Sequence, residues 1–237
     1  MTNSFIKSEQ KILKTGFKVI DNLNCLNPGN LVSIQGKCVQ AEQFIISLMQ
    51  NILDNNEGYV LLMHRYDFYT FTSVIFDNNF EDDKVLISNR LSKNSILSKN
   101  GLPTDAEVLQ RSLSAWLEMD KFKHLQNKKL LAIITPIYKL RYDVTEEAAT
   151  LTLKDAAQIL NVPVICWQKD SSDILLAADM TFKLAALNGY KEPIDIEVIN
   201  PSGDTFAHIQ ANKSSLKYTK HLKDCKKLWF YEEKEND

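Results

Sequence analysis

The chain has 237 residues, a formal net charge of -2, 44% hydrophobic residues and 24% charged residues. This is ordinary globular usage, and it excludes an intrinsically disordered chain. The near-neutral charge argues against a protein that coats nucleic acid, although it permits local basic patches. No apolar run approaches the roughly 20 residues of a membrane-spanning helix, and no secretory signal is visible, so we expect a cytoplasmic protein without a membrane partner.

In chain order, short apolar runs typical of strands alternate with longer amphipathic stretches typical of helices. Residues 31–34 form the first predicted strand, after a Pro28-Gly29 turn, and residues 41–53 form the first predicted helix. The further predicted strands of this part are 59–63, 84–88, 130–134 and 162–167, and the further predicted helices are 68–78, 104–122 and 144–160.

Beyond residue 173 the pattern changes to strands without intervening helices. These predicted strands cover residues 180–187, 194–199 and 205–210, and the cluster 200–204 predicts a hairpin turn between the last two. The whole pattern predicts an α/β fold: a mostly parallel, twisted sheet flanked by helices, with antiparallel strands at its C-terminal edge. We see no internal repeat and no linker, so a single main domain is expected.

Four cysteines and four histidines are scattered along the chain. They form no Cys-x-x-Cys pair and no cluster at metal-ligand spacing. We therefore predict no metal site, and we interpret the cysteines as free, mostly buried thiols in a reducing compartment.

A glycine follows the first predicted strand and precedes the first predicted helix, which is the setting of a phosphate-binding loop. That loop reads Gly-x-x-x-x-Gly-Lys-Ser/Thr: its glycines let amides converge on the phosphates, its lysine neutralises them, and its hydroxyl holds magnesium. Gly36 takes the first position, but Ala41, Glu42 and Gln43 stand where the second glycine, the lysine and the hydroxyl belong. The frame of such a loop is present without its chemistry.

The exchange of lysine for Glu42 matters most for nucleotide binding. It places a repelling charge roughly 4 Å from the phosphates, where each such contact amounts to about 4 kcal/mol at an effective dielectric near 20. Gln43 offers magnesium no hydroxyl, and Ala41 adds a Cβ where the backbone must come close. Two other interpretations stay open: a plain surface turn unrelated to nucleotides, and a substitute lysine supplied by Lys37.

Several segments, in order and spacing, resemble the C-terminal motor domain of DnaB-type hexameric replicative helicases. They are Thr-Gly-Phe and the following residues at 15–21, Leu-Asn-Pro-Gly-Asn-Leu at 26–31, 130–141, Leu-Lys-Asp-Ala-Ala-Gln-Ile-Leu-Asn-Val-Pro-Val at 153–164, and Ala178-Asp179. The resemblance spans about residues 15–210. It implies a RecA-like fold of the P-loop NTPase type.

The resemblance also implies where catalytic residues would stand, and the expected residue types are missing there. The family's magnesium-binding Asp falls on Thr135. Its catalytic Glu falls near Tyr66, with Asp67 one place on, and its sensor Gln falls on Lys169, or on Gln168 after a one-residue slip.

The family's KQRNG element, whose Lys and Arg reach a neighbouring subunit's γ-phosphate, falls on 200–203, where no basic residue stands. Because hydrolysis in this class depends on positioning and charge stabilisation, the combined loss predicts a pseudo-ATPase without ATP or magnesium as cofactor. A divergent ATPase or DNA helicase that uses Lys37 and Asp67 with ATP and magnesium is the alternative.

The chain divides, in this interpretation, into an N-terminal arm at 1–14, the RecA-like domain at 15–212, and a basic segment with an acidic tail at 213–237. The basic segment is either a solvated helix face or a nucleic-acid contact. Its lysines are Lys213, Lys217, Lys220, Lys223, Lys226 and Lys227.

We therefore expect a catalytically degenerate helicase-like protein that serves as a binding or accessory module in DNA replication or mobile-element maintenance. Its partners would be DNA or a helicase-like protein. A homo-oligomeric scaffold without a nucleic-acid role is the weaker alternative.

Overall fold

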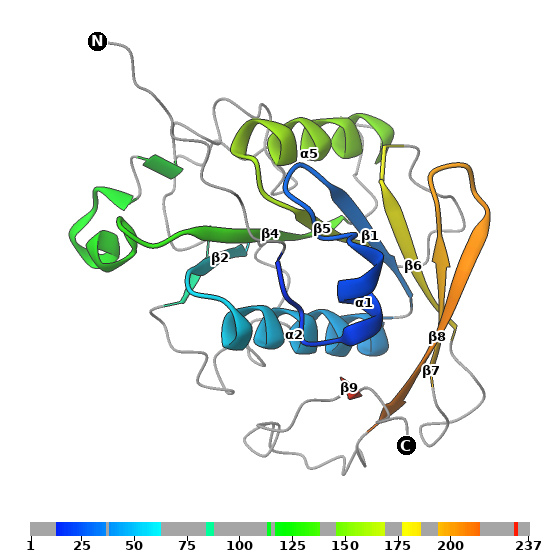
Figure 1. Ribbon diagram of the computed structural model, residues 1–237. Coiled ribbons are helices and arrows are strands. Elements are labelled where there is room, and N and C mark those ends of the chain that lie inside the picture. Colours follow the sequence, from blue (N-terminus) through cyan, green and yellow to red (C-terminus); the bar gives the residue numbers. More distant parts are fainter. Residues whose placement is uncertain are drawn as a thin grey trace.

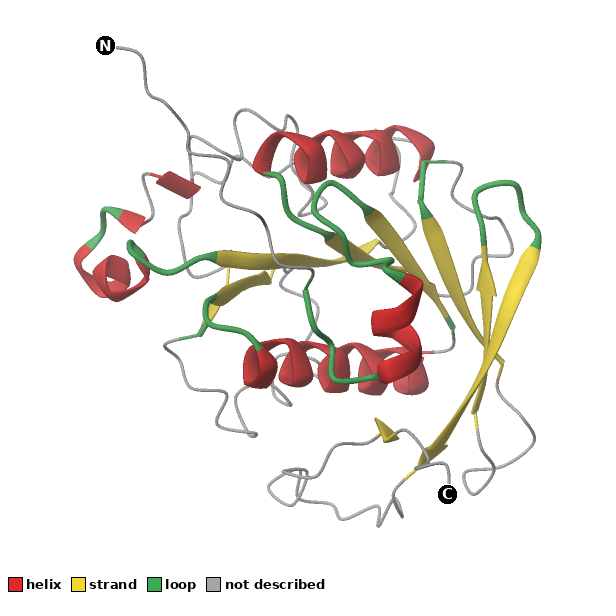
Figure 2. Cartoon of the chain, viewed as in Figure 1, coloured by secondary structure: helices red, strands yellow, loops and turns green. Residues whose placement is uncertain are grey.

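The computed structural model describes residues 13–36, 38–62, 84–87, 113–114, 117–137, 146–168, 177–185, 194–213 and 230–231. A central sheet lies between helices, with α5 on one face and α1 and α2 on the other (Figures 1 and 2). The helices are α1 (Lys18–Leu23), α2 (Cys38–Asn55), α5 (Glu146–Leu160) and the 3-10 helix η2 (Asp120–Leu125). None of the helices in the described ranges is both long and apolar enough to cross a bilayer.

The sheet contains nine strands in the order β3-β2-β4-β5-β1-β6-β7-β8-β9. Strands β3 to β6 run parallel, and β7, β8 and β9 each pair antiparallel with the strand before. The mostly parallel sheet with an antiparallel C-terminal edge is therefore confirmed. The strands are β1 (Leu31–Gln35), β2 (Tyr59–Leu62), β3 (Val85–Ile87), β4 (Leu130–Ile137), β5 (Val164–Gln168), β6 (Met180–Ala185), β7 (Ile194–Ile199), β8 (Thr205–Lys213) and β9 (Phe230–Tyr231).

Most predicted elements recur with shifted ends. Helix α2 begins at Cys38, three residues before the predicted start, and β4 and β8 each continue three residues past their predicted ends. Strand β5 begins only after Pro163, which has no amide to donate to the sheet. Helix α1 and strand β9 were not predicted, and the predicted helix 68–78 and residues 104–112 of the next one lie outside the described residues.

The two helical layers cover opposite faces because side chains alternate along each strand. Val32 and Ile34 of β1 pack into the core beneath α1 and α2, whereas Leu31 packs with Leu153 and Ala157 of α5. All five residues of β1 are buried, as expected for a central strand of a parallel sheet. Ser33 and Gln35 are therefore buried polar residues on the α5 face.

A hydrogen-bonded turn docks the chain onto the α2 face just before α1. Asp21 Oδ1 accepts bonds from both the amide and the hydroxyl of Thr15, each at 2.7 Å, and Thr15 is fully buried. Phe17 then packs against Phe44 of α2, with ring centroids 6.3 Å apart, and Phe44 packs against Phe182 of β6 at 6.2 Å. The first segment of the helicase resemblance thus has a packing role.

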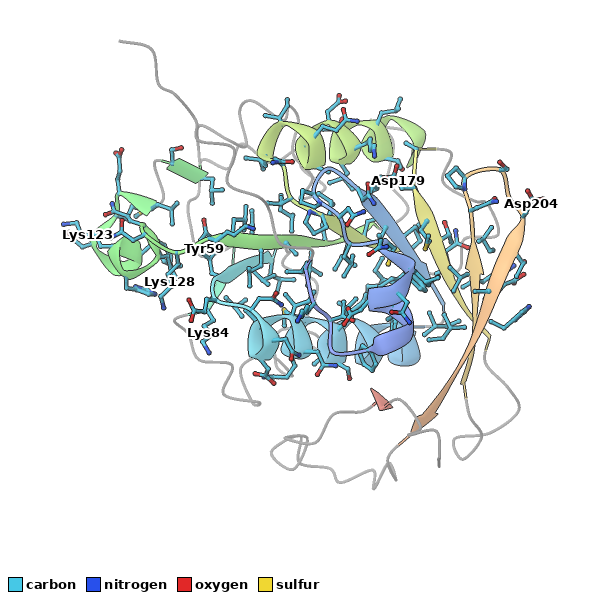
Figure 3. The ribbon with its side chains drawn as sticks, in the orientation of Figure 1. Tyr59, Lys84, Lys123, Lys128, Asp179 and Asp204 are labelled. Carbon is cyan, nitrogen blue, oxygen red and sulfur yellow. The ribbon has the colours of Figure 1, made fainter. Side chains whose placement is uncertain are left out.

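Asp179 ties three elements together at the amino ends of the parallel strands (Figure 3). Its Oδ2 accepts a bond from the Leu31 amide at 2.6 Å and an ion pair from Lys154 Nζ of α5 at 2.5 Å. Lys154 Nζ also donates to the Gly29 carbonyl at 2.9 Å. The Ala178-Asp179 segment of the resemblance therefore holds α5 and β6 to the start of β1.

Gly58 is the point where backbone approaches backbone most closely. A Cβ there would lie 2.3 Å from the Lys129 carbonyl oxygen and 2.7 Å from Leu131 Cγ, at a φ of +155°. Gly29 also has a positive φ, of +83°, but its nearest neighbour would be 3.9 Å away.

We predict that Gly58→Ala destabilises the protein by about 3 kcal/mol, because the clash is with backbone and cannot relax through a rotamer change. Gly29→Ala is the matched control, with strain but no clash, and is expected to cost only about 1 kcal/mol. Urea unfolding of the two variants measures the difference, and equal losses would contradict the close approach.

Candidate functional site

The carboxyl ends of β1, β4 and β5 lie side by side, which is the edge where open α/β sheets bind ligands. Gln35 of β1 is level with Gln168 of β5, which is level with Ile137 of β4. One row earlier, Ser33 is level with Cys166, and Cys166 with Thr135. The sequence-predicted positions Gly36, Thr135 and Gln168 are therefore brought together at one edge.

Buried polar side chains fill the α5 face of this edge. Gln35 Nε2 donates to Gln168 Oε1 at 3.0 Å, and the Ser33 hydroxyl donates to the same oxygen at 3.4 Å. Ser33, Gln35, Thr135 and Gln168 are each exposed by 2% or less. We call these four residues the polar cluster; its Gln168 carbonyl is already held by two donors from the neighbouring strand.

The segment that corresponds to a phosphate-binding loop is short. Strand β1 ends at Gln35 and helix α2 begins at Cys38, so six of the eight positions from Gly36 to Gln43 are helical. The Gly36 amide donates to the Gln168 carbonyl at 3.4 Å. A Cβ on Gly36 would lie 3.1 Å from Leu184 Cβ and 3.6 Å from Ala41 Cβ, and Ala41 is fully buried.

Several predicted site residues lie outside the description. Lys37, Tyr66, Asp67 and Lys169 fall outside the described residues, and the side chains of Glu42 and Gln43 are not described although their backbone is helical. Lys213 ends β8, and of it only the backbone is described. The other lysines of the basic segment, outside the described residues, are Lys217, Lys220, Lys223, Lys226 and Lys227.

Sequence reasoning missed Ser33 and Gln35 as members of the site. The signal was present, because both are polar residues in a strand that is otherwise apolar and buried. A buried polar side chain needs a hydrogen-bond partner, so each of them indicated a partner on a neighbouring strand.

Two described cysteines are buried thiols. Burial raises the pKa of Cys166 and that of Cys25 to about 12, from an ordinary value of 9.0, and a hydrogen bond with Ser33 opposes the shift only weakly at Cys166. Within the described ranges, no three His, Cys, Asp or Glu residues lie close enough together to hold a metal ion.

The fold is RecA-like, as in the ATPase domains of DnaB-type helicases. The chain superposes on the solved ATPase domain of a DnaB-like helicase with a TM-score of 0.60 at 10% identity, over 93% of this chain and 90% of that one. It superposes on a second DnaB-like replicative helicase, solved in a study of its interactions with primase, with a TM-score of 0.56 at 11% identity. That match covers 91% of this chain but 62% of the helicase, so the chain spans less than two thirds of it.

A third similar structure, the flagellar accessory protein FlaH from Methanocaldococcus jannaschii, has a TM-score of 0.49 at 12% identity, over 84% of this chain and 93% of FlaH. No protein-family model and no curated protein sequence matches the chain. The likeness is thus one of fold, and it confirms the resemblance to the helicase motor domain at that level.

We predict that Gln168→Leu destabilises the protein by about 1–3 kcal/mol, because it leaves the Ser33 hydroxyl and the Gln35 amide without their shared acceptor. Gln126→Leu makes the same exchange at an exposed turn, and is expected to change stability by no more than about 0.5 kcal/mol. Urea denaturation compares the two. Equal effects would mean that the polar cluster contributes nothing.

We also predict that stability falls as pH rises above about 9. There the unfolded chain ionises its thiols while Cys25 and Cys166 stay protonated in the fold, so the unfolded state binds fewer protons and is favoured. At pH 10 each thiol is expected to cost about 1.4 kcal/mol. Urea unfolding at neutral pH and at pH 10, under reducing conditions, measures the loss. A Cys25→Ala/Cys166→Ala double variant should lose less, and an unchanged slope would contradict the assignment.

Proposed function

We propose that this chain is a catalytically degenerate relative of DnaB-type motor domains, a pseudo-ATPase that acts by binding. It would serve as an accessory module in DNA replication or mobile-element maintenance, with DNA, a helicase-like protein or further copies of itself as partners. The observation that carries the proposal is the conversion of the phosphate-binding frame into helix from Cys38 onward.

An α-helix is a poor substitute for a phosphate-binding loop because its amides are already bonded. From the fifth residue of α2, each amide donates within the helix, and only the first four amides remain available. The converging amides that the glycine-rich loop supplies are therefore reduced to a single helix N-terminus. Glu42, on that first turn and a half, adds a negative charge where phosphates would sit.

The polar cluster supports the same proposal. Gln168 accepts bonds from Ser33 and Gln35 and is 1% exposed, so its side chain is held within the sheet layer. Thr135, at the position of the family's magnesium-binding Asp, is 1% exposed and carries no charge. A magnesium ion bridging two phosphates prefers carboxylate and hydroxyl ligands, and the described part of this edge offers no carboxylate.

Removing these groups together removes most of the catalytic power of the class. Phosphoryl transfer depends on positioning and on charge stabilisation by lysine, magnesium and an arginine finger, and the finger alone accounts for roughly 10³–10⁵ in rate. The hairpin 200–203, where the finger element would stand, forms the turn between β7 and β8 and has no basic residue.

The test is nucleotide binding and turnover by the purified chain. We expect no ATP binding tighter than about 1 mM in calorimetry and no phosphate release above a protein-free control. The variant Lys37→Ala is expected to leave both results unchanged. A motor domain with an intact Gly-x-x-x-x-Gly-Lys-Thr loop is the positive control.

The competing function is a divergent ATPase that draws on Lys37 and Asp67. Micromolar ATP binding that Lys37→Ala abolishes would establish it and reject the pseudo-ATPase. Magnesium-dependent turnover lost in Asp67→Asn would add the catalytic step.

A further inference from the structure

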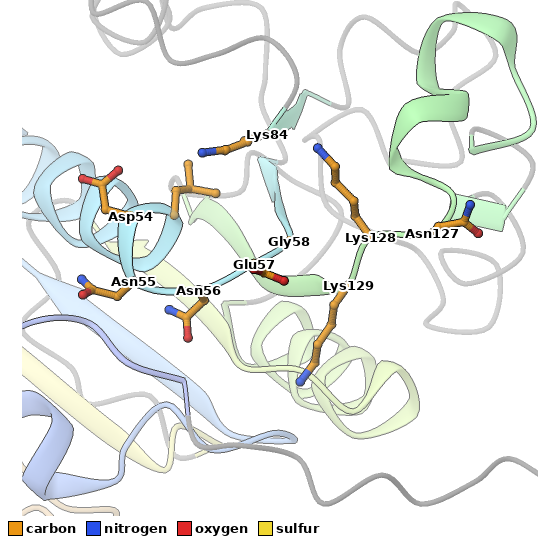
Figure 4. A pocket seen from close by; sticks show the side chains of 10 residues that line it. Asp54, Asn55, Asn56, Glu57, Gly58, Lys84, Asn127, Lys128 and Lys129 are labelled. Carbon is orange, nitrogen blue, oxygen red and sulfur yellow. The ribbon is translucent and has the colours of Figure 1, made fainter.

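A second concave site lies at the opposite end of the sheet from the nucleotide edge. A pocket of about 710 Å³ opens between the end of α2 and the starts of β3 and β4. Its walls include Asp54 and Glu57 on one side, Lys84 just before β3, and Lys128 and Lys129 just before β4 (Figure 4). Because β2, β3 and β4 are parallel, this is their amino edge, and none of the sequence-predicted site residues lines it.

The backbone around this pocket is fixed by the sheet. The Tyr59 amide donates to the Lys129 carbonyl, and the Val60 amide donates to the Lys84 carbonyl, both at 2.9 Å. The two lysines are thereby held on either side of the first residues of β2. The close approach of Gly58 to the Lys129 carbonyl leaves this arrangement little freedom, so a ligand would meet a backbone that is already in place.

The polar groups at the end of α2 are mostly engaged already. Asp54 Oδ1 accepts a bond from Gln50, and Asn55 Nδ2 donates to the Asn51 carbonyl, each at 2.8 Å. Asn56 Nδ2 donates to the carbonyls of Ile52 and Lys14 at 2.8 and 2.7 Å.

The ammonium groups are less engaged. In the described part of the chain, no hydrogen bond or ion pair engages the ammonium of Lys128 or Lys129, and both residues are exposed. In Figure 4 Lys128 extends toward Lys84 across the pocket.

The lining carries both signs of charge, with three ammonium groups against two carboxylates. The carbonyl end of α2 adds partial negative charge on the side of Asp54 and Glu57. A phosphodiester strand brings a negative charge at every nucleotide and nothing to face those groups, so the lining disfavours it. A peptide segment suits it better, because carboxylates can meet the lysines while backbone and amide groups meet the asparagines.

We propose that this pocket docks an acidic segment of a protein partner. The carboxylates of that segment bind Lys84 and Lys128, which lie on facing walls. The inference does not rest on the state of the nucleotide edge, since the two sites lie at opposite ends of the strands; nucleotide titration therefore tests one proposal and the peptide experiment tests the other.

The experiment measures fluorescence anisotropy with three probes: a short labelled peptide in which Asp and Glu alternate with Gly and Ser, the same peptide with Asn and Gln in their place, and a single-stranded oligodeoxynucleotide of equal negative charge. We expect the acidic peptide to bind most tightly, and to weaken by about tenfold in Lys84→Glu and in Lys128→Glu. Lys123→Glu is the matched control, because Lys123 is exposed, pairs with Asp120 at 2.5 Å and lies outside the pocket (Figure 3). It is expected to change binding by less than about twofold.

Circular dichroism of each variant verifies that the fold is kept, and Lys128→Gln separates loss of charge from its reversal with an intermediate effect. Tighter binding of the oligonucleotide than of the acidic peptide overturns the proposal in favour of a nucleic-acid site. The absence of peptide binding, or equal effects of Lys123→Glu and Lys128→Glu, overturns it altogether.

Discussion

The burial of β1 on both faces is the constraint on which the rest of the structure depends. This strand has neighbours on both sides and helices above and below, so each polar group on it must be satisfied inside the protein. Its apolar residues Val32 and Ile34 hold α2, and its polar residues Ser33 and Gln35 bind Gln168. The same strand therefore builds the core on one face and the polar cluster on the other.

That arrangement bears directly on what the carboxyl edge can do. In a working phosphate site, polar side chains and free amides point out of the edge toward a ligand. Here Gln168 is satisfied by its neighbours, Gly36 contacts the β5 backbone, and the helix begins at Cys38. The scaffold thus resembles a helicase motor domain while its polar groups are spent on internal bonds. A protein with such an edge contributes surfaces, and the pocket at the amino edge is a defined one.

The amino edge shows how the scaffold is held together independently of the nucleotide site. Asp179 joins β1, β6 and α5, and Gly58 lets β2 approach the Lys129 carbonyl. The segments that resemble the helicase family at residues 15–21 and 178–179 serve packing and hydrogen bonding there. A likeness in such segments therefore preserves the fold and carries no information about catalysis, which explains how fold likeness coexists with an altered loop.

The sequence by itself determined the order of strands and helices after residue 30, the antiparallel edge and the replaced loop residues, because apolar periodicity and residue type are local properties. Helix α1 escaped notice because it is short, and β9 because two residues carry no period. Only the tertiary structure decided that α2 starts at Cys38 and that Ser33, Gln35 and Gln168 form one cluster. Strand neighbours are separated by more than 130 positions there, and no local pattern encodes which buried donor meets which acceptor.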